Sequence, residues 1–320
     1  MVGGTVSDCA NRVSIVGGDC QIGGIVGMSE AGKVINCTNY GTIEGEYRVG
    51  GMVGYNAAGR IEKCMSNATI QAKYVVGGMT GRSESTGMIT ECYNLGSIIS
   101  TGSVADGESS GAPLISPTGG IVGNSHGTIT RCVNSGTITA LKRVVGGIAG
   151  RNNEGTVSYC CNLGNVTGEM VVGGIAGNNR GSIMYVYNRA EEIKITVGGG
   201  CDVGGIAGNQ NTNNNAYVKY AYNTAKVTAK NGLGGIAGNF VIGKIDRTYN
   251  LGILNTTATT DVGQIAGGKY NVSAITNSSG TTESEMKGWS QATISTNLGQ
   301  FVKKENSLPI LNITVRDITF

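Results

Sequence analysis

The feature that most constrains this chain is a short glycine motif that returns at a nearly constant spacing. Eight copies follow the pattern V-G-G-I-V/A-G, several with a substitution at one or two positions, and a more degenerate ninth copy covers residues 262–267. The first glycines of the copies are Gly23, Gly50, Gly77, Gly119, Gly146, Gly173, Gly204, Gly234 and Gly263. Four of the spacings between them are 27 residues, three are 29–31 and one is 42. A period near 27 therefore governs residues 1 to about 275, which indicates a repeat architecture.

A second motif, G-x-I-x-x-C-x-N-x-G-T-I, follows the first within each period, as residues 32–43 show. Its apolar runs last only three to six residues and are rich in β-branched side chains, which favours short strands over helices. We therefore predict an all-β parallel β-solenoid, or β-helix, of about nine to ten coils with roughly 4.8 Å between neighbouring strands. Leucine-rich, ankyrin and propeller repeats fit the period and composition less well.

The repeats divide the chain into two parts. Residues 1–275 form the predicted glycine-rich solenoid, and residues 276–320 form a predicted C-terminal capping segment. In the latter, Thr282-x-x-Glu285 is a capping box before a short segment that holds Met286 and Trp289, and residues 292–320 are expected to form strands. We expect Trp289 to plug the end of the core. The glycine pair forms either a corner or bulge, or a strand covered on both faces, and the hand of the coil stays open.

Alignment of the repeats places like residues in columns, and two of these columns are polar or sulfur-containing. An asparagine occurs two residues after each cysteine in nearly every coil, where it can bond its own turn and the next coil. Because cysteines one coil apart are not clustered as C-x-x-C, we expect small buried thiols rather than a metal site or a disulfide framework. The predicted structural ladder comprises Cys37, Cys64, Cys92, Cys132, Cys160, Asn39, Asn94, Asn134, Asn162, Asn188, Asn223 and Asn250.

Candidate binding residues lie in the column that follows the cysteines and in the insertions. The column carries four tyrosines, Tyr93, Tyr187, Tyr222 and Tyr249, which either stack on a ligand or are ordinary strand-surface residues. Insertions in solenoids become surface loops and often lie at binding faces. The largest insertion, residues 101–118, contains Asp106 and Glu108, and residues 209–215 form a second polar loop.

The sequence argues against several chemistries. The chain has one histidine, His126, which nearly excludes catalytic triads and most metal sites. Its seven aspartates are scattered, so the paired carboxylates of a glycosidase are not evident. The net charge of +3 does not indicate nucleic-acid binding, and no run of 18 apolar residues suggests membrane insertion. We therefore expect no enzyme activity, no metal and no cofactor.

These repeats resemble the GLUG-repeat family of glycine-rich repeats in large bacterial surface proteins. The tail is also similar to the stretch that commonly closes such arrays, through Met286, Trp289, Phe301–Lys304 and Leu308–Leu311. This chain has Ser307-Leu308 where the family usually has Gly-Tyr before the proline. The resemblance implies an extracellular location at the bacterial cell surface, with signal and anchor outside this chain, an adhesive role and no catalysis by the repeats.

Three functional hypotheses follow. The first is a noncatalytic module that acts as an adhesin stalk or as a rod binding a surface glycan or protein. The second is a filament or scaffold subunit that stacks through its own ends, because the first coil begins within a motif. The third is a polysaccharide-degrading β-helix enzyme, which rests on fold analogy alone.

Overall fold

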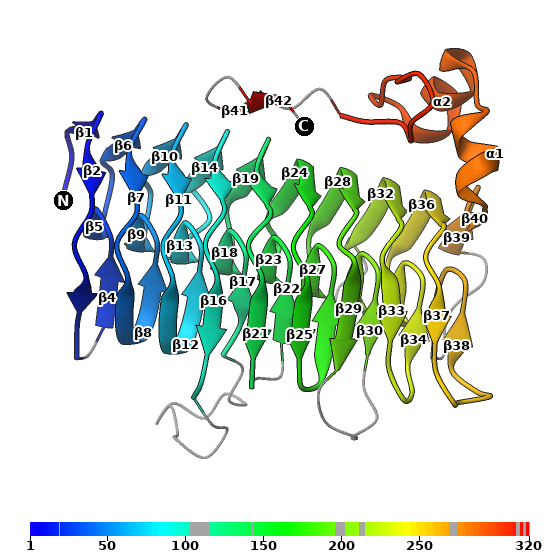
Figure 1. Cartoon of the computed structure of the whole chain (residues 1–320), viewed down its shortest axis with the longest axis horizontal. Helices are drawn as coiled ribbons and strands as arrows, with labels where there is room; N and C mark the ends of the chain where they lie inside the picture. The colour runs from blue at the N-terminus through cyan, green and yellow to red at the C-terminus, as the bar shows by residue number, and fades with distance from the viewer. Residues whose placement is uncertain are drawn as a thin grey trace.

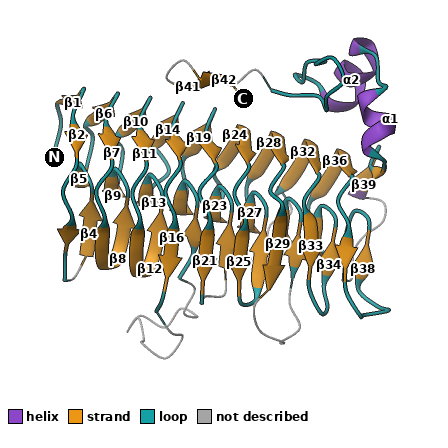
Figure 2. Cartoon of the chain, viewed as in Figure 1, coloured by secondary structure: helices purple, strands orange, loops and turns teal. Residues whose placement is uncertain are grey.

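The chain forms an elongated rod with three parallel β-sheets along its length (Figure 1). The computed structural model describes residues 1–18, 20–102, 116–141, 144–195, 202–210, 215–268 and 274–311, together with the backbone of 314–315 and 318–319. The backbone winds through the sheets in about nine turns, which confirms the predicted parallel β-solenoid. Helices occur only in the C-terminal segment of the described chain (Figure 2).

Sheet A and sheet B each contain sixteen strands, and sheet C contains eight. Sheet A consists of β1 (Thr5–Ser7), β2 (Ala10–Asn11), β6 (Lys33–Ile35), β7 (Thr38–Asn39), β10 (Arg60–Glu62), β11 (Met65–Ser66), β14 (Met88–Thr90), β15 (Tyr93–Asn94), β19 (Thr128–Thr130), β20 (Val133–Asn134), β24 (Thr156–Asn162), β28 (Ser182–Asn188), β32 (Tyr217–Asn223), β36 (Lys244–Asn250), β39 (Ile275–Thr276) and β40 (Ser279–Gly280).

Sheet B consists of β3 (Ile15–Val16), β4 (Cys20–Gly23), β8 (Ile43–Gly50), β12 (Ile70–Gly77), β16 (Ile98–Ser100), β17 (Thr118–Gly119), β21 (Ile138–Ala140), β22 (Val144–Gly146), β25 (Val166–Gly168), β26 (Val171–Gly173), β29 (Glu192–Ile195), β30 (Val203–Gly204), β33 (Lys226–Thr228), β34 (Leu233–Gly234), β37 (Leu254–Asn255) and β38 (Val262–Gly263). Sheet C consists of β5 (Val26–Ser29), β9 (Val53–Asn56), β13 (Thr80–Ser83), β18 (Val122–Ser125), β23 (Ala149–Asn152), β27 (Ala176–Asn179), β31 (Ala207–Gln210) and β35 (Ala237–Phe240).

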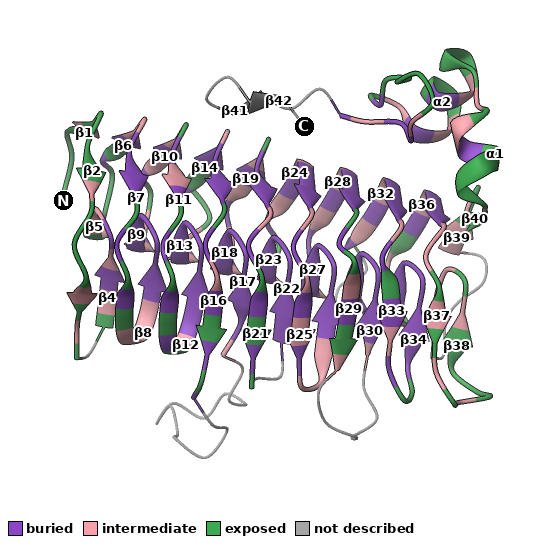
Figure 3. Cartoon of the chain, viewed as in Figure 1, coloured by how far each residue is buried: buried purple, intermediate pink, exposed green. Residues whose placement is uncertain are grey.

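The strands pair in a register that keeps equivalent repeat positions side by side. Val157 of β24 pairs with Ile183 of β28, which is followed in the same column by Val218 of β32 and Ile245 of β36. All four side chains are buried, and Figure 3 shows buried stretches recurring on successive strands along the rod. A site shaped for a branched side chain in one coil is thus repeated in the next, which explains the sequence columns.

The glycine pair forms the corner between sheets B and C, which settles one alternative that the sequence left open. In the second coil, β8 ends at Gly50, Gly51 and Met52 form a bend, and β9 begins at Val53. Val49 and Met52, on the two sides of this corner, belong to two different buried hydrophobic clusters. A Cβ atom on Gly51 would collide with the carbonyl oxygen of the next coil's Gly78. Only glycine fits so close to a neighbouring backbone.

The asparagines form a ladder of side-chain amides inside the solenoid. From Asn94 to Asn250 each Nδ2 donates to the amide oxygen of the next coil at 2.7–2.9 Å. The ladder continues to Gln264, whereas at Asn39 the Nδ2 donates to the Gly51 carbonyl because the next coil carries Ser66. These amides are buried, so their hydrogen bonds satisfy groups that would otherwise be costly to remove from water.

The ladder cysteines lie in the core beside the branched column. All five are buried free thiols, and each donates from its Sγ to the carbonyl two residues earlier at 3.1–3.2 Å. Burial and the neighbouring thiols raise the pKa of Cys92 well above its ordinary value, so it stays protonated near neutral pH. These thiols act as small apolar fillers with one weak donor.

The C-terminal segment lies along the outer face of sheet A, contrary to the expectation that it plugs the end of the core. It contains α1 (Glu283–Lys287), α2 (Gln291–Leu298) and a short antiparallel pair, β41 (Thr314–Val315) with β42 (Ile318–Thr319). Thr282 caps α1 in the predicted capping box, but α2 occupies residues where strands were expected. Trp289 packs edge-on against Tyr249 rather than at the core's end. Figure 1 shows the segment doubling back along the rod.

Candidate functional site

In sheet A, one residue of each coil adopts a left-handed backbone conformation, and these residues form a column on the outer face of the sheet. The residue directly before each cysteine-column position has φ between 48° and 56°. The column reads Asp8, Asn36, Lys63, Glu91, Arg131, Tyr159, Tyr185, Tyr220, Arg247 and Asn277. This conformation is costly for residues with a Cβ. It turns the backbone so that residues on both sides, such as Val157 and Cys160, can face the core while Tyr159 points outward.

Three consecutive tyrosines of this column stack face to face. Tyr159 and Tyr185 have ring centroids 4.9 Å apart, and Tyr185 and Tyr220 repeat that distance with rings only 4° from parallel. Arg131 lies over the Tyr159 ring and Arg247 over the Tyr220 ring, each 5.6 Å from the centroid. The ring faces are occupied by one another and by guanidinium groups, and Gly299 of the C-terminal segment lies against Tyr185 and Tyr220. The stack therefore forms a packed wall on sheet A rather than a free aromatic surface.

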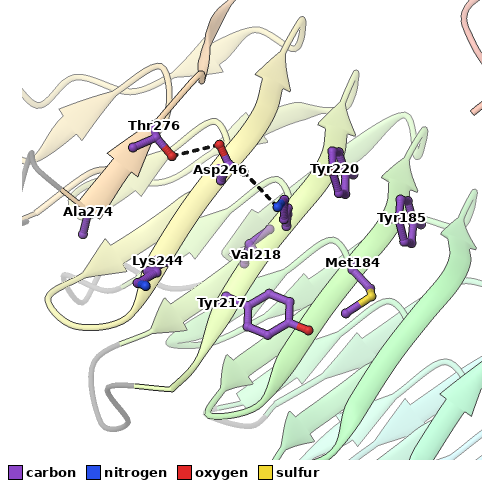
Figure 4. A pocket seen from close by; sticks show the side chains of 10 residues that line it. Met184, Tyr185, Tyr217, Val218, Tyr220, Lys244, Asp246, Ala274 and Thr276 are labelled. Carbon is purple, nitrogen blue, oxygen red and sulfur yellow. Dashed lines mark hydrogen bonds and ion pairs between the residues drawn. The ribbon is translucent and has the colours of Figure 1, made fainter. Parts of the chain in front are cut away.

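A groove of about 740 Å³ runs beside this stack, across the first halves of β28, β32 and β36. Tyr185 and Tyr220 border it, and Met184, Tyr217 and Lys244 lie along it. Figure 4 shows the stacked rings edge-on, whereas the Tyr217 ring presents its face. The register neighbours of Tyr217 are Ser182 and Lys244, so the paired positions on the two adjacent strands do not stack an aromatic ring on it.

The groove also contains one carboxylate, Asp246, that forms ion pairs with two cations. Lys219 Nζ lies 3.3 Å from Asp246 Oδ2, and Arg247 Nη1 lies 2.8 Å from the same oxygen. Thr276 and Asn277 donate to Asp246 Oδ1 at 2.8 and 2.9 Å. Burial opposes ionisation of this carboxyl, but the hydrogen bonds from Asn277, Thr276 and Lys219 outweigh it and lower its pKa. Asp246 is therefore an ionised, fully occupied group that fixes the position of Lys219.

The column of candidate binding tyrosines is buried, which corrects the prediction of an exposed binding row. Tyr93 and Tyr249 are 7% exposed, Tyr187 is 1% and Tyr222 is 0%. They lie on the outer face of sheet A as expected, but the C-terminal segment covers them. Phe301 packs on both Tyr187 and Tyr222, and the Tyr222 hydroxyl donates to the Pro309 carbonyl at 2.7 Å. No repeat pattern indicates that Phe301 and Pro309, far later in the chain, fold back over this column.

Most residues of the two loop insertions that the sequence predicts as possible binding loops lie outside the described residues. Asp106 and Glu108 lie outside the described residues, as do residues 211–214 of the second loop. The groove residues that sequence reasoning missed were nevertheless visible in the repeat alignment. Tyr159, Tyr185 and Tyr220 occupy one column in three successive coils, directly before the cysteine column rather than after it.

The described residues contain no group of three or more His, Cys, Asp or Glu side chains placed to hold a metal ion. His126, the single histidine, lies in the turn between sheets C and A, where the Asn153 amide nitrogen is 3.2 Å from both ring nitrogens. Burial lowers the pKa of His126, and the nearby guanidinium groups of Arg82 and Arg151 act in the same direction. A search of the described helices for one long and apolar enough to cross a membrane finds none.

Comparison with known families identifies one match. The model of the GLUG motif matches residues 45–71, a segment that runs from the middle of β8 through sheet C and sheet A into β12. Comparison with curated proteins and with solved structures finds no match. The matched segment is one full turn of the solenoid, and the other turns repeat its register. The protein is thus a β-solenoid repeat module with a GLUG motif, consistent with the GLUG-repeat family.

Proposed function

We propose that this protein is a noncatalytic, ligand-binding rod of a bacterial surface adhesin, and that the groove on sheet A binds a surface glycan. The observation that carries the proposal is the Tyr217 ring, which lines the groove between the non-aromatic register neighbours Ser182 and Lys244 and beside the Lys219–Asp246 pair. An aromatic face packs well against the C–H face of a sugar ring, and a few oriented polar groups can bond its hydroxyls.

The make-up of the groove favours binding over hydrolysis. Its lining in the described part of the chain includes one carboxylate, Asp246, which already accepts from four neighbouring side chains. Glycoside hydrolysis normally needs a second carboxyl group within about 5–9.5 Å, one of the pair acting as an acid. An ionised and fully paired carboxylate is poorly suited to donate that proton.

The elongated shape of the solenoid supports a role in holding a binding site away from the cell surface. Each coil adds roughly 4.8 Å of rise, so repeats extend a binding groove away from an attachment point with little flexibility. We therefore propose a location outside the bacterial cell, which the rod shape and the GLUG motif support. Protease treatment of intact cells tests the location: the account expects loss of the protein from intact cells, and full protection would contradict it.

Binding to a glycan panel tests the groove. We expect the wild-type protein to bind at least one neutral or weakly charged oligosaccharide, and Tyr217→Ala to weaken that binding at least tenfold. Met88→Ala is a matched control, because Met88 occupies the equivalent register position on β14, far along the rod. Equal loss of binding in both variants, or no loss in Tyr217→Ala, would show that the groove is not the glycan-binding site. Absence of reducing-end release supports the noncatalytic assignment, whereas sustained release would refute it.

A further inference from the structure

A second set of polar side chains lies on the outer face of sheet C, separate from the groove on sheet A. One residue from each successive strand stands in register along this face. The row reads Met28, Tyr55, Arg82, Asn124, Arg151, Asn178, Asn209 and Asn239. From Arg82 onward every member is an arginine or an asparagine, so this part of the row offers hydrogen-bonding groups and no apolar side chain.

The charged groups toward the two ends of this row have partners within the protein. Toward one end Arg82 Nε donates to Glu84 Oε1 at 2.6 Å, and the Tyr55 hydroxyl donates to the same oxygen at 3.0 Å. Toward the other end Asn209 and Asn239 both donate to Asp202 Oδ2. The charges of Arg82 and Asp202 are therefore both met by neighbouring side chains.

In the middle of the row, the positive charge of Arg151 is not paired with a carboxylate of the described chain. Within the described residues, the guanidinium of Arg151 has no carboxylate partner, and its Nε is buried without a hydrogen bond. Burial lowers the pKa of Arg151, and the neighbouring cations Arg180 and Arg82 lower it further. Arg180 Nη1 reaches the Asn153 amide oxygen at 3.5 Å, which places this second guanidinium at the adjoining turn. A half-buried cation beside like charges is costly unless an anion joins it.

We propose that Arg151, with Arg180 beside it, binds the carboxylate or sulfate group of an acidic saccharide. A guanidinium matches such planar or tetrahedral oxyanions through paired N–H donors. The flanking Asn124 and Asn178 amides lie one strand spacing away on either side, where they can bond the hydroxyls of neighbouring sugar units. An acidic peptide fits less well, because the row lacks the apolar pockets that normally hold peptide side chains.

NMR of the arginine Nε–Hε groups tests the oxyanion site directly. Sulfate is titrated against chloride at constant ionic strength. We expect the Arg151 signal to shift and saturate, and the Arg60 signal to stay in place because Arg60 is already paired with Glu62 at 2.7 Å. Equal, unsaturated movement of all arginine signals would overturn the site.

Calorimetry then distinguishes the source of the oxyanion. The probes are a galacturonic acid tetramer, a sulfated galactose tetramer, a neutral galactose tetramer and a tetra-aspartate peptide. We expect one or both acidic saccharides to bind, and Arg151→Gln to weaken that binding at least tenfold while Arg60→Gln changes it less than twofold. Stronger binding of the peptide, equal binding of the neutral tetramer or no effect of Arg151→Gln would each overturn the proposal. Tyr217→Ala should leave this binding unchanged, so the test is independent of the groove.

Discussion

The inner and outer faces of the same strands follow different rules. On β28, β32 and β36 one inner column keeps a branched aliphatic side chain, as Ile183, Val218 and Ile245 show, and each strand ends in a buried asparagine. The outer column directly before it changes from Ser182 to Tyr217 to Lys244. An inner side chain must fit the coil above and the coil below, whereas an outer side chain that no other segment covers is free to vary. The buried residues therefore specify the fold, and the exposed residues determine which ligand the solenoid can bind.

Replacing an amide of the ladder should have the largest effect on stability. Asn134 accepts from Asn94 at 2.7 Å and donates to Asn162 at 2.7 Å and to the Gly136 carbonyl at 3.0 Å. Asn134→Leu keeps the size but leaves buried partners unpaired, so we expect a loss of about 4 kcal/mol in the free energy of unfolding. Chemical denaturation measures it, with Asn255→Leu on the exposed surface as the control. A loss below 1 kcal/mol would show that the ladder is not structural.

A methyl group at the corner should be nearly as damaging. A Cβ on Gly147 would collide with the Gly174 carbonyl and with the Asn162 amide. Because two backbones would have to separate, we expect Gly147→Ala to cost about 3 kcal/mol. Gly18→Ala is the control, since nothing lies within 4 Å of its added Cβ. Equal melting temperatures for the two variants would contradict the close corner.

The covered tyrosines offer a smaller test, on the outer face. Tyr222→Phe removes the hydrogen bond to the Pro309 carbonyl and should cost about 1 kcal/mol. The loss should loosen the C-terminal segment, so limited proteolysis near residue 309 should accelerate. In Tyr249→Phe, the matched control, the ring contact with Trp289 is retained. Unchanged proteolysis in Tyr222→Phe would mean that the segment is held by other contacts.

The groove ion pair should give the smallest effect, visible as a dependence on pH. The folded-state pKa of Asp246 is lowered, so its contribution to stability is present above its unfolded pKa of about 4 and is lost as pH falls through the folded value. Burial opposes the charge on Lys219, but Asp246 outweighs it and raises the pKa, so that contribution disappears only at strongly alkaline pH. We expect Asp246→Asn to flatten the acid limb of the stability curve below about pH 4 by less than 1 kcal/mol. An acid limb identical to that of the wild type would contradict this pairing.

The inner face could be predicted from sequence because the same residue types recur there at a spacing of one coil, as stacked coils require. The Val34 and Cys37 columns, the asparagine ladder and the parallel fold all follow from residues that recur at one spacing. The outer face could not be predicted in the same way. The burial of Tyr187 and Tyr222 depends on one copy of Phe301, which belongs to no repeat. The left-handed residue before each cysteine was also missed, because its column contains Asn, Lys, Glu, Tyr and Arg rather than glycine.

The most direct test of this division uses a core variant on β28 and an outer variant on the neighbouring strand β32. Ile183→Ala opens a cavity in the core and should cost about 3 kcal/mol of stability while leaving glycan binding at permissive temperature unchanged. Tyr217→Ala should leave the melting temperature nearly unchanged and weaken glycan binding at least tenfold. Both properties are measured on both variants, and this crossed pattern is the predicted result. Loss of binding in Ile183→Ala at full folding, or intact binding in Tyr217→Ala, would contradict it.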